Sequence, residues 1–175
     1  AERERIVLER NPHYHARDSV RLERVTALPH ENIDSVYQQY LAGAVHWMDT
    51  VPAGKLAEIK RHPDFYTAPF LSSYYYRFNC SEPPFDDARV RRALSMAIDR
   101  DYLVDNVTGL GEQASTAYTP PMANYQPPAG RGYDPEAARA LLARVRDEGV
   151  SVDAVEILFN DRDRHRRIAE AIAQM

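Results

Sequence analysis

The feature that most constrains the fold is the alternation of strand-like and helix-like runs in the N-terminal part of the chain. RIVLER alternates Ile6 and Leu8 with polar neighbours, the period of a half-buried strand, and RLERVTAL follows as a second such run. NIDSVYQQYLAGAV and PAGKLAEIKR have helical spacing, with the strand-like AVHWMDTV between them. Alternation of this kind predicts an α/β fold with parallel strands and helical crossovers, in which residues 21–28 and 44–50 are parallel neighbours.

The C-terminal part contains the best-defined helices. PPFDDARVRRALSMAIDR places apolar residues on one helical face, and Asp86 or Asp87 can cap it. DPEAARALLARVRDEGV has a cap at Asp134, a proline at its first helical position and Gly149 at its end. FYTAPFLSSYYYRFN and VDAVEILF have strand-like composition, and NDRDRHRRIAEAIAQM predicts a last helix.

Bulk composition excludes some classes of protein. The 175 residues carry a net charge of -4, which gives no field to attract phosphate backbones, so nucleic acid is not expected as a partner. The single cysteine, Cys80, cannot form an internal disulfide. No apolar run is long enough to span a bilayer. Both ends fall inside regular patterns, so we expect the sequence to be a piece of a longer protein.

Cofactor and metal motifs are weak. Gly109, Gly111 and Ala114 fit the spacing GxGxxA, but a dinucleotide loop follows a strand and this one follows a predicted helix. His13, His15 and His46 could supply imidazole ligands, yet no cysteine or carboxylate supports them at a suitable spacing. A calcium loop beginning at Asn160 lacks its glycine and its terminal glutamate. We therefore expect no cofactor and no metal site.

An enzyme is the weaker functional class. Ser72, Ser73 and Cys80 lie outside any nucleophile elbow, and no histidine is placed by the sequence to activate them. A hydrolytic enzyme on the same α/β scaffold stays an alternative, which would require Ser73 or Cys80 beside a histidine. A structural interaction module is a further alternative, with the tyrosines buried against another chain.

The three consecutive tyrosines leave two interpretations open. On a strand, Tyr74 and Tyr76 point to one face and Tyr75 to the other. One face could pack into a core, since aromatic side chains are mostly buried. Large rings on both faces are also what we expect in the wall of a ligand cleft.

The segment YYYRFNCSEPPFDDARVRRALSMAIDRDYLV closely resembles the signature of the large extracytoplasmic solute-binding proteins of oligopeptide ABC importers. RIVLERNPHYH and AYTPPM resemble the same family in the same order, so the similarity runs over essentially the whole chain. Family members are about three times this length, which again implies an interior fragment. The resemblance implies a type II periplasmic-binding-protein fold, an α/β fold built on mixed sheets with helical crossovers, whose two lobes close on a ligand.

The resemblance also implies a lobe division and a binding site. Residues 1–98 would belong to the first lobe and 99–175 would open the second, with the boundary between 99 and 125. Tyr74 and Tyr76 match positions that the family directs toward its ligand, and Tyr118 lies in the matching AYTPPM segment. These three are the expected substrate-binding residues.

The function implied is ligand capture rather than catalysis. The protein would bind oligopeptides, or related solutes such as dipeptides, nickel complexes, haem or sugars, and deliver them to a membrane permease. It would act in the periplasm, with a secretion signal upstream of this segment. The peptide main chain would pair with strand edges, while roomy pockets accept varied side chains.

Overall fold

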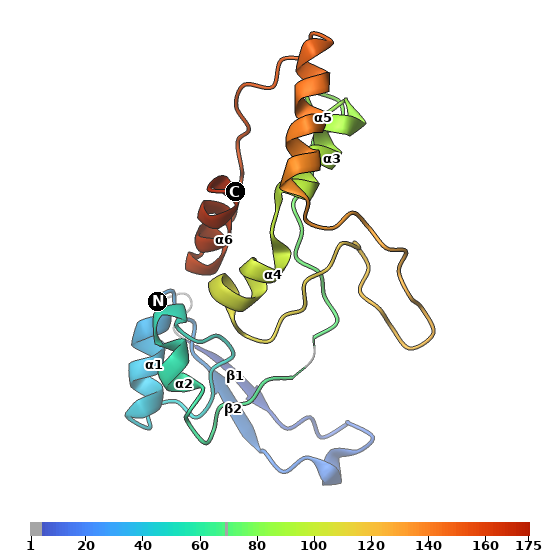
Figure 1. Cartoon of the computed structure of the whole chain (residues 1–175). Coiled ribbons are helices and arrows are strands. Elements are labelled where there is room, and N and C mark those ends of the chain that lie inside the picture. The colour runs from blue at the N-terminus through green and yellow to red at the C-terminus, as the bar shows by residue number, and fades with distance from the viewer. Residues whose placement is uncertain (1–4, 69) are drawn as a thin grey trace. The chain divides into compact units, whose positions relative to one another are not determined.

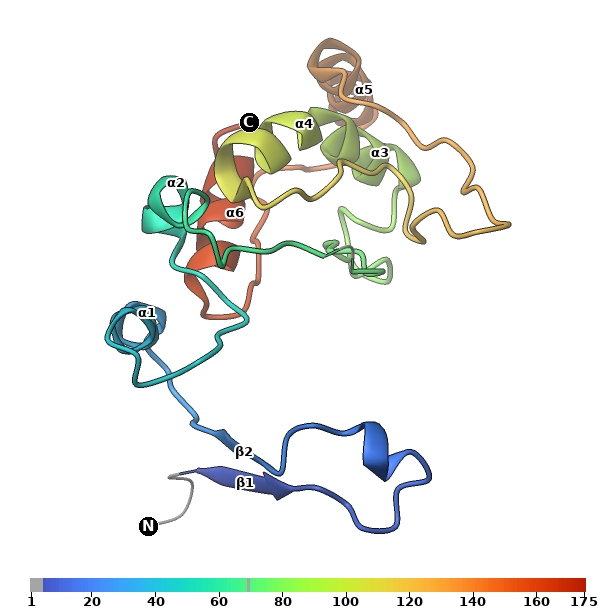
Figure 2. The ribbon, with the colours of Figure 1, turned by 90° about the horizontal axis from the view of Figure 1, so that it is seen from below.

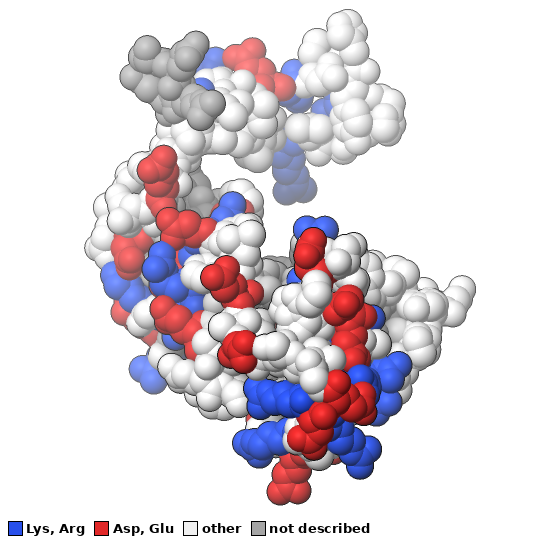
Figure 3. Space-filling model, turned by 90° about the horizontal axis from the view of Figure 1, so that it is seen from above, with Lys and Arg blue, Asp and Glu red and all other residues white. Residues whose placement is uncertain are grey.

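The computed structural model describes residues 5–68 and 70–175, and its contacts divide the chain into two compact units, Ala1–Pro63 and Asp64–Met175 (Figure 1). None of the described helices combines the length and the apolarity needed to cross a membrane. In the face shown in Figure 3, acidic and basic side chains lie next to one another. The predicted lobe boundary between 99 and 125 stays a prediction.

The first unit begins with a two-stranded antiparallel sheet. Strand β1 (Ile6–Glu9) pairs with β2 (Arg24–Ala27), and a long connection containing the short helix η1 (Arg17–Ser19) projects beyond the strands (Figure 2). The register places Glu9 opposite Arg24, and an Arg24 Nη2 lies 2.9 Å from Glu9 Oε1. A cross-strand ion pair of this kind supports the register.

The predicted parallel pairing of 21–28 with 44–50 is wrong. The partner of β2 is β1, running antiparallel, and residues 44–50 form no strand. The reason lies at the end of helix α1 (Ile33–Leu41), where Gly43 has a φ of 73°. The N–H groups of Ala44 and Val45 donate to the Gln39 carbonyl, at 2.9 and 3.4 Å, so they close the helix instead of joining a ladder.

Helix α1 packs with the short pair η2 (Ala53–Lys55) and α2 (Leu56–Ile59). The Tyr37 ring is buried, its hydroxyl donates to Glu58 Oε1 at 3.1 Å, and the Lys55 ammonium lies 5.3 Å from the ring centre. Ile59 is buried as well. Burial, together with the bond to Glu58, raises the pKa of Tyr37.

The second unit is built on helices α3 (Ala88–Ala97) and α5 (Pro135–Asp147), which lie side by side in Figure 1. Both begin as predicted: Asp87 accepts from the Arg89 N–H and Asp134 accepts from the Ala137 N–H. Val90 and Val145 are fully buried and pack with Val152. A second cluster joins Ala93, Met96 and Ala138, and this small-residue contact lets the helices approach closely.

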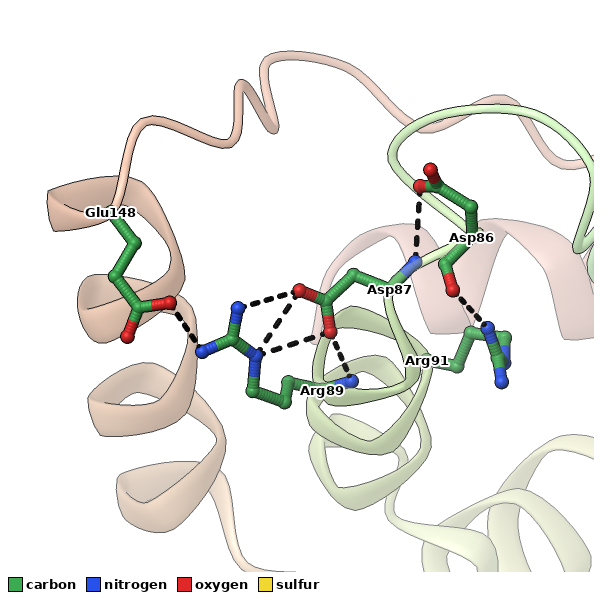
Figure 4. Close-up of polar contacts among 5 residues, drawn as sticks. All are labelled: Asp86, Asp87, Arg89, Arg91 and Glu148. Atoms are coloured by element: carbon green, nitrogen blue, oxygen red, sulfur yellow. Dashed lines mark hydrogen bonds and ion pairs between the residues drawn. The ribbon is translucent and has the colours of Figure 1, made fainter.

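Polar contacts join α3 and α5 at both ends of the pair. At one end the Asp134 N–H donates to the Met96 carbonyl at 2.9 Å. At the other, Arg89 binds Asp87 through Nε and Nη2 and reaches Glu148 Oε2 at 2.6 Å through Nη1 (Figure 4). The start of α3 therefore lies beside the end of α5, and the two helices are antiparallel.

The remaining helices of this unit are α4 (Arg100–Tyr102), the π-helical turn η3 (Leu103–Thr108) and α6 (Asp163–Ala173). Helix α6 packs on η3, and the Arg164 guanidinium pairs with Glu112 in the loop after η3. The segments 65–79 and 152–159, predicted to be strand-like, form no ladder within the described residues. A strand requires a hydrogen-bonded neighbour, and the part of the chain that the structure describes offers none to these segments.

The buried valines generate a first prediction. In the full-length protein, Val145→Ala should lower the free energy of unfolding by about 1 to 3 kcal/mol, because it removes two methyl groups from a closed core. Urea unfolding measures this change. The matched variant Val155→Ala, whose side chain is 40% exposed, should stay within about 0.5 kcal/mol of the wild type. Equal losses in both variants would show that the α3–α5 contact does not stabilise the fold.

The ion pair at the start of α3 generates a second prediction. The hydrogen bonds from Arg89 lower the pKa of Asp87. The ion pair therefore contributes its full stabilisation above the ordinary carboxyl pKa of about 3.9, and this contribution disappears as the pH falls through the lowered pKa of Asp87. Asp87→Asn keeps a capping side chain but removes the charge. Its melting temperature should therefore fall less steeply than that of the wild type below about pH 4.

The control for this experiment is Asp105→Asn, at an exposed aspartate of η3. Thermal melts between neutral and strongly acidic pH should show the wild-type acid dependence in this control. Parallel curves for the wild type and Asp87→Asn would contradict the proposed contribution of the pair.

Candidate functional site

The predicted binding residues lie in two pairs of tyrosines in the second unit. Tyr74 and Tyr76 meet edge to face, with ring centres 5.6 Å apart, and the Tyr74 hydroxyl donates to that of Tyr76 at 3.4 Å. Tyr118 meets Tyr75, with ring centres 4.5 Å apart, and donates to its hydroxyl at 3.0 Å. The structure therefore brings Tyr74 and Tyr76 together, and it places Tyr118 against the opposite side of the triplet.

The alternation predicted for a strand holds in this segment without a ladder. Residues 74–76 are extended enough that Tyr74 and Tyr76 share one side, while Tyr75 reaches the loop that carries Tyr118. A hydrogen bond joins two parts of that loop: the Gly130 N–H donates to the Thr116 hydroxyl at 3.1 Å.

The tyrosines are largely accessible in this chain. Tyr74 is 50% exposed, Tyr75 43% and Tyr118 67%, while Tyr76 is half-buried. Neither hydrophobic cluster of the described residues includes a tyrosine. The interpretation that these rings fill the core of this unit therefore lacks support from the packing within the chain.

Two phenylalanines connect the tyrosines to the helical core. The rings of Phe78 and Phe85 lie 5.3 Å apart, and Phe85 packs against the cluster of Val90, Val145 and Val152. The Phe85 carbonyl also accepts from Arg91 of α3 at 2.5 Å. The segment after the tyrosines is thereby fixed to the start of α3.

Burial and hydrogen bonding raise the pKa of two of the tyrosine hydroxyls. Burial, followed by the bond to Tyr74, raises the pKa of Tyr76 well above its usual range. The bond to Tyr75 raises the pKa of Tyr118. Both hydroxyls are therefore neutral near pH 7 and can donate to carbonyls or accept from N–H groups.

His165, on the first turn of α6, lies beside Tyr74, and no sequence motif singled it out. Its ring lies 5.0 Å from that of Tyr74, tilted by 33°. Burial, then the charges of Arg162 and Arg164, lower the pKa of His165. In the sequence this residue lies in the charged run RDRHRR, which gives no local indication of a contact with Tyr74. The contact depends on how α6 packs on η3.

The other candidate groups have separate surroundings. Cys80 is exposed and its Sγ lies 3.6 Å from the Phe78 carbonyl; within the described residues no histidine hydrogen-bonds to it. The glycine-rich loop closes η3, where Gly109 is left-handed and the Leu110 N–H donates to Glu112. Among the described residues, no group of three histidine, cysteine or carboxylate side chains is arranged to hold a metal ion.

The chain is similar to known proteins over its whole length. The family description "Bacterial extracellular solute-binding proteins, family 5 Middle" matches residues 1–175. The chain is 32% identical to the periplasmic oligopeptide-binding protein OppA of Escherichia coli K12, over 98% of this chain and 34% of that protein. It is 30% identical to the periplasmic murein peptide-binding protein MppA of the same strain. It spans about a third of the length of these relatives.

Solved structures agree on the fold. A periplasmic oligopeptide-binding protein, OppAIV of Borrelia burgdorferi, matches with a TM-score of 0.83 and 30% identity over 98% of this chain and 35% of that one. OppA of Haemophilus influenzae, in complex with the peptide RPPGFSPFR, matches with a TM-score of 0.78 and 28% identity. The predicted fold class, the type II periplasmic-binding-protein kind, is therefore confirmed for a chain that covers part of such a protein.

The surroundings of His165 generate a third prediction. In the full-length protein, NMR titration of its imidazole should give a midpoint below the ordinary value of about 6.5. Arg162→Gln should raise that midpoint, because it removes one of the two nearby positive charges. Arg139→Gln, at an exposed arginine of α5, makes the same charge change and should leave it unaltered. An ordinary midpoint in the wild type would contradict the burial of this ring.

Proposed function

This chain belongs to family 5 of the bacterial extracellular solute-binding proteins, and on that premise we propose that it is part of a protein that captures oligopeptides or related small solutes outside the inner membrane and delivers them to an ABC permease. The relatives named above are periplasmic and bind oligopeptides or murein peptides by name. Because the chain spans a third of their length, ligand and permease are proposals for the full-length protein.

The observation that supports this proposal most is the accessible aromatic surface formed by Tyr74, Tyr76 and His165. Its rings offer contact area with few rotatable bonds, and its hydroxyls can donate or accept. A peptide main chain presents N–H and C=O groups at regular intervals whatever its side chains are. Neutral phenols suit such a ligand better than fixed charges, since they impose no preference for the sign of a side chain.

Tyr75 and Tyr118 form a second part of the proposed site. Their hydroxyls are joined by the 3.0 Å bond, which fixes both rings relative to each other while each remains exposed. A surface of this kind is organised before the ligand arrives, so less side-chain freedom is lost on binding. Closure of the two lobes would then exclude water from the ligand, as in other hinged binding proteins.

A binding role is consistent with a sequence in which no nucleophile motif is recognisable. A binding protein needs contact area and reversible hydrogen bonds, whereas a hydrolase needs a nucleophile within reach of a base. Cys80, one of the candidates for that role, lies beside a backbone carbonyl. The hydrolase and interaction-module alternatives have no contact in the described residues that favours them.

A fourth prediction tests the function. In the full-length protein, Tyr74→Ala combined with Tyr76→Ala should weaken binding of a tri- to pentapeptide pool by about 1 to 3 kcal/mol, because aromatic contacts contribute strongly when a ligand buries them. Isothermal titration calorimetry measures the affinity, and thermal melting should show little loss of stability.

The matched control is Tyr66→Ala, at a tyrosine that is 84% exposed. It should leave peptide affinity unchanged. Unchanged affinity in the double variant, with a large drop in melting temperature, would mean that Tyr74 and Tyr76 are core residues of the full-length protein. No peptide binding by the wild type would remove oligopeptides as the ligand and leave the related small solutes.

A further inference from the structure

The Tyr74 ring has little support from its own segment. Residues 74–76 form no ladder within the described residues, and Tyr74 is 50% exposed. Its hydroxyl donates to that of Tyr76 at 3.4 Å, whereas O–H···O hydrogen bonds are usually about 2.5 to 3.0 Å long. A bond of this length restrains the ring weakly, so the orientation of Tyr74 depends on another contact.

The imidazole of His165 supplies that contact. Its ring centre lies 5.0 Å from that of Tyr74, with the planes tilted by 33°, and Tyr76 meets Tyr74 at 5.6 Å and 76°. Tyr74 is therefore the central ring of three. Burial, then the charges of Arg162 and Arg164, lower the pKa of His165, so near pH 7 the imidazole is neutral and packs as an uncharged ring.

His165 itself is held by helix α6, which is fixed in two ways. Ile168 and Ala169, one turn further along the helix, are buried. Arg164 pairs with Glu112, and that carboxylate in turn accepts from a hydroxyl and from an N–H group at the end of η3, each at 3.0 Å. The imidazole therefore projects from a packed helix toward a ring on an irregular segment, so of the two it is the better supported.

We propose that His165 is a positioning residue of the binding site: its ring holds Tyr74, and through Tyr74 the neighbouring Tyr76, in the arrangement that receives the solute. This inference rests on the proposed function, and it gives His165 a role beyond that of contact area. A ring that is already held loses less side-chain freedom when a ligand binds. His165 therefore raises the affinity for the solute through Tyr74.

The test is a double-mutant cycle in the full-length protein, with affinity for the tri- to pentapeptide pool measured by isothermal titration calorimetry. His165→Ala should weaken binding at least about threefold, as expected for the loss of one aromatic contact. His165→Phe keeps a ring and should restore the affinity. In the Tyr74→Ala background His165→Ala should cause no further loss, because the residue through which it acts is missing. The matched control His46→Ala, at an exposed histidine of the first unit, should bind as the wild type does.

An equal loss of affinity in both backgrounds, or a loss that His165→Phe does not restore, would overturn the proposal, because His165 would then act without Tyr74. Urea unfolding of the same four proteins without ligand gives a second cycle. The effects of His165→Ala and Tyr74→Ala on the unfolding midpoint should be non-additive, and additive effects would also overturn the proposal. His165→Gln and Tyr74→Leu complete the cycle where an alanine variant does not fold. If the wild type binds no peptide, oligopeptide capture fails by itself and the unfolding cycle decides the role of His165.

Discussion

The contact on which the second unit depends is the burial of Val90 against Val145. Each side chain is fully removed from solvent, which is worth about 1.5 to 3 kcal/mol apiece on an area basis. The ion pairs around Arg89 are exposed enough that their charges are screened, so they fix the register of the two helices more than they hold them together. Apolar burial therefore supplies the stability of the pair, and the polar ties at its two ends supply its alignment.

The position of Tyr74 and Tyr76 depends on this helix pair. Phe85 packs on the valine cluster and contacts Phe78, which lies two residues beyond Tyr76. A short, irregular segment without a ladder would otherwise be free to move, because it lacks the hydrogen bonds of a sheet. The phenylalanine contact substitutes for those bonds at one end of the segment, and the Tyr75–Tyr118 pair supplies a second attachment.

The sequence predicted helices well because their signals are local. Asp87 and Asp134 cap the helices that they were expected to cap, and Gly149 follows α5 with a φ of 92°. Strands were predicted less well for the opposite reason. A period-two pattern indicates which face of a strand is apolar but not which segment is its neighbour. The predicted partner of 21–28 was therefore wrong, and 152–159 is unpaired within the described residues.

The same distinction separates the parts of the candidate site. Tyr74 and Tyr76 are two residues apart, so extended backbone alone was enough to predict that they share a side. Tyr75 meets Tyr118, and Tyr74 meets His165, across loops and helix packing that no local pattern encodes. Side chains that come together in this way leave only weak traces in composition, such as the charged run around His165. In a binding protein, where no reaction demands a fixed motif, most of the site is of this second kind, and its recognition depends on the fold as a whole.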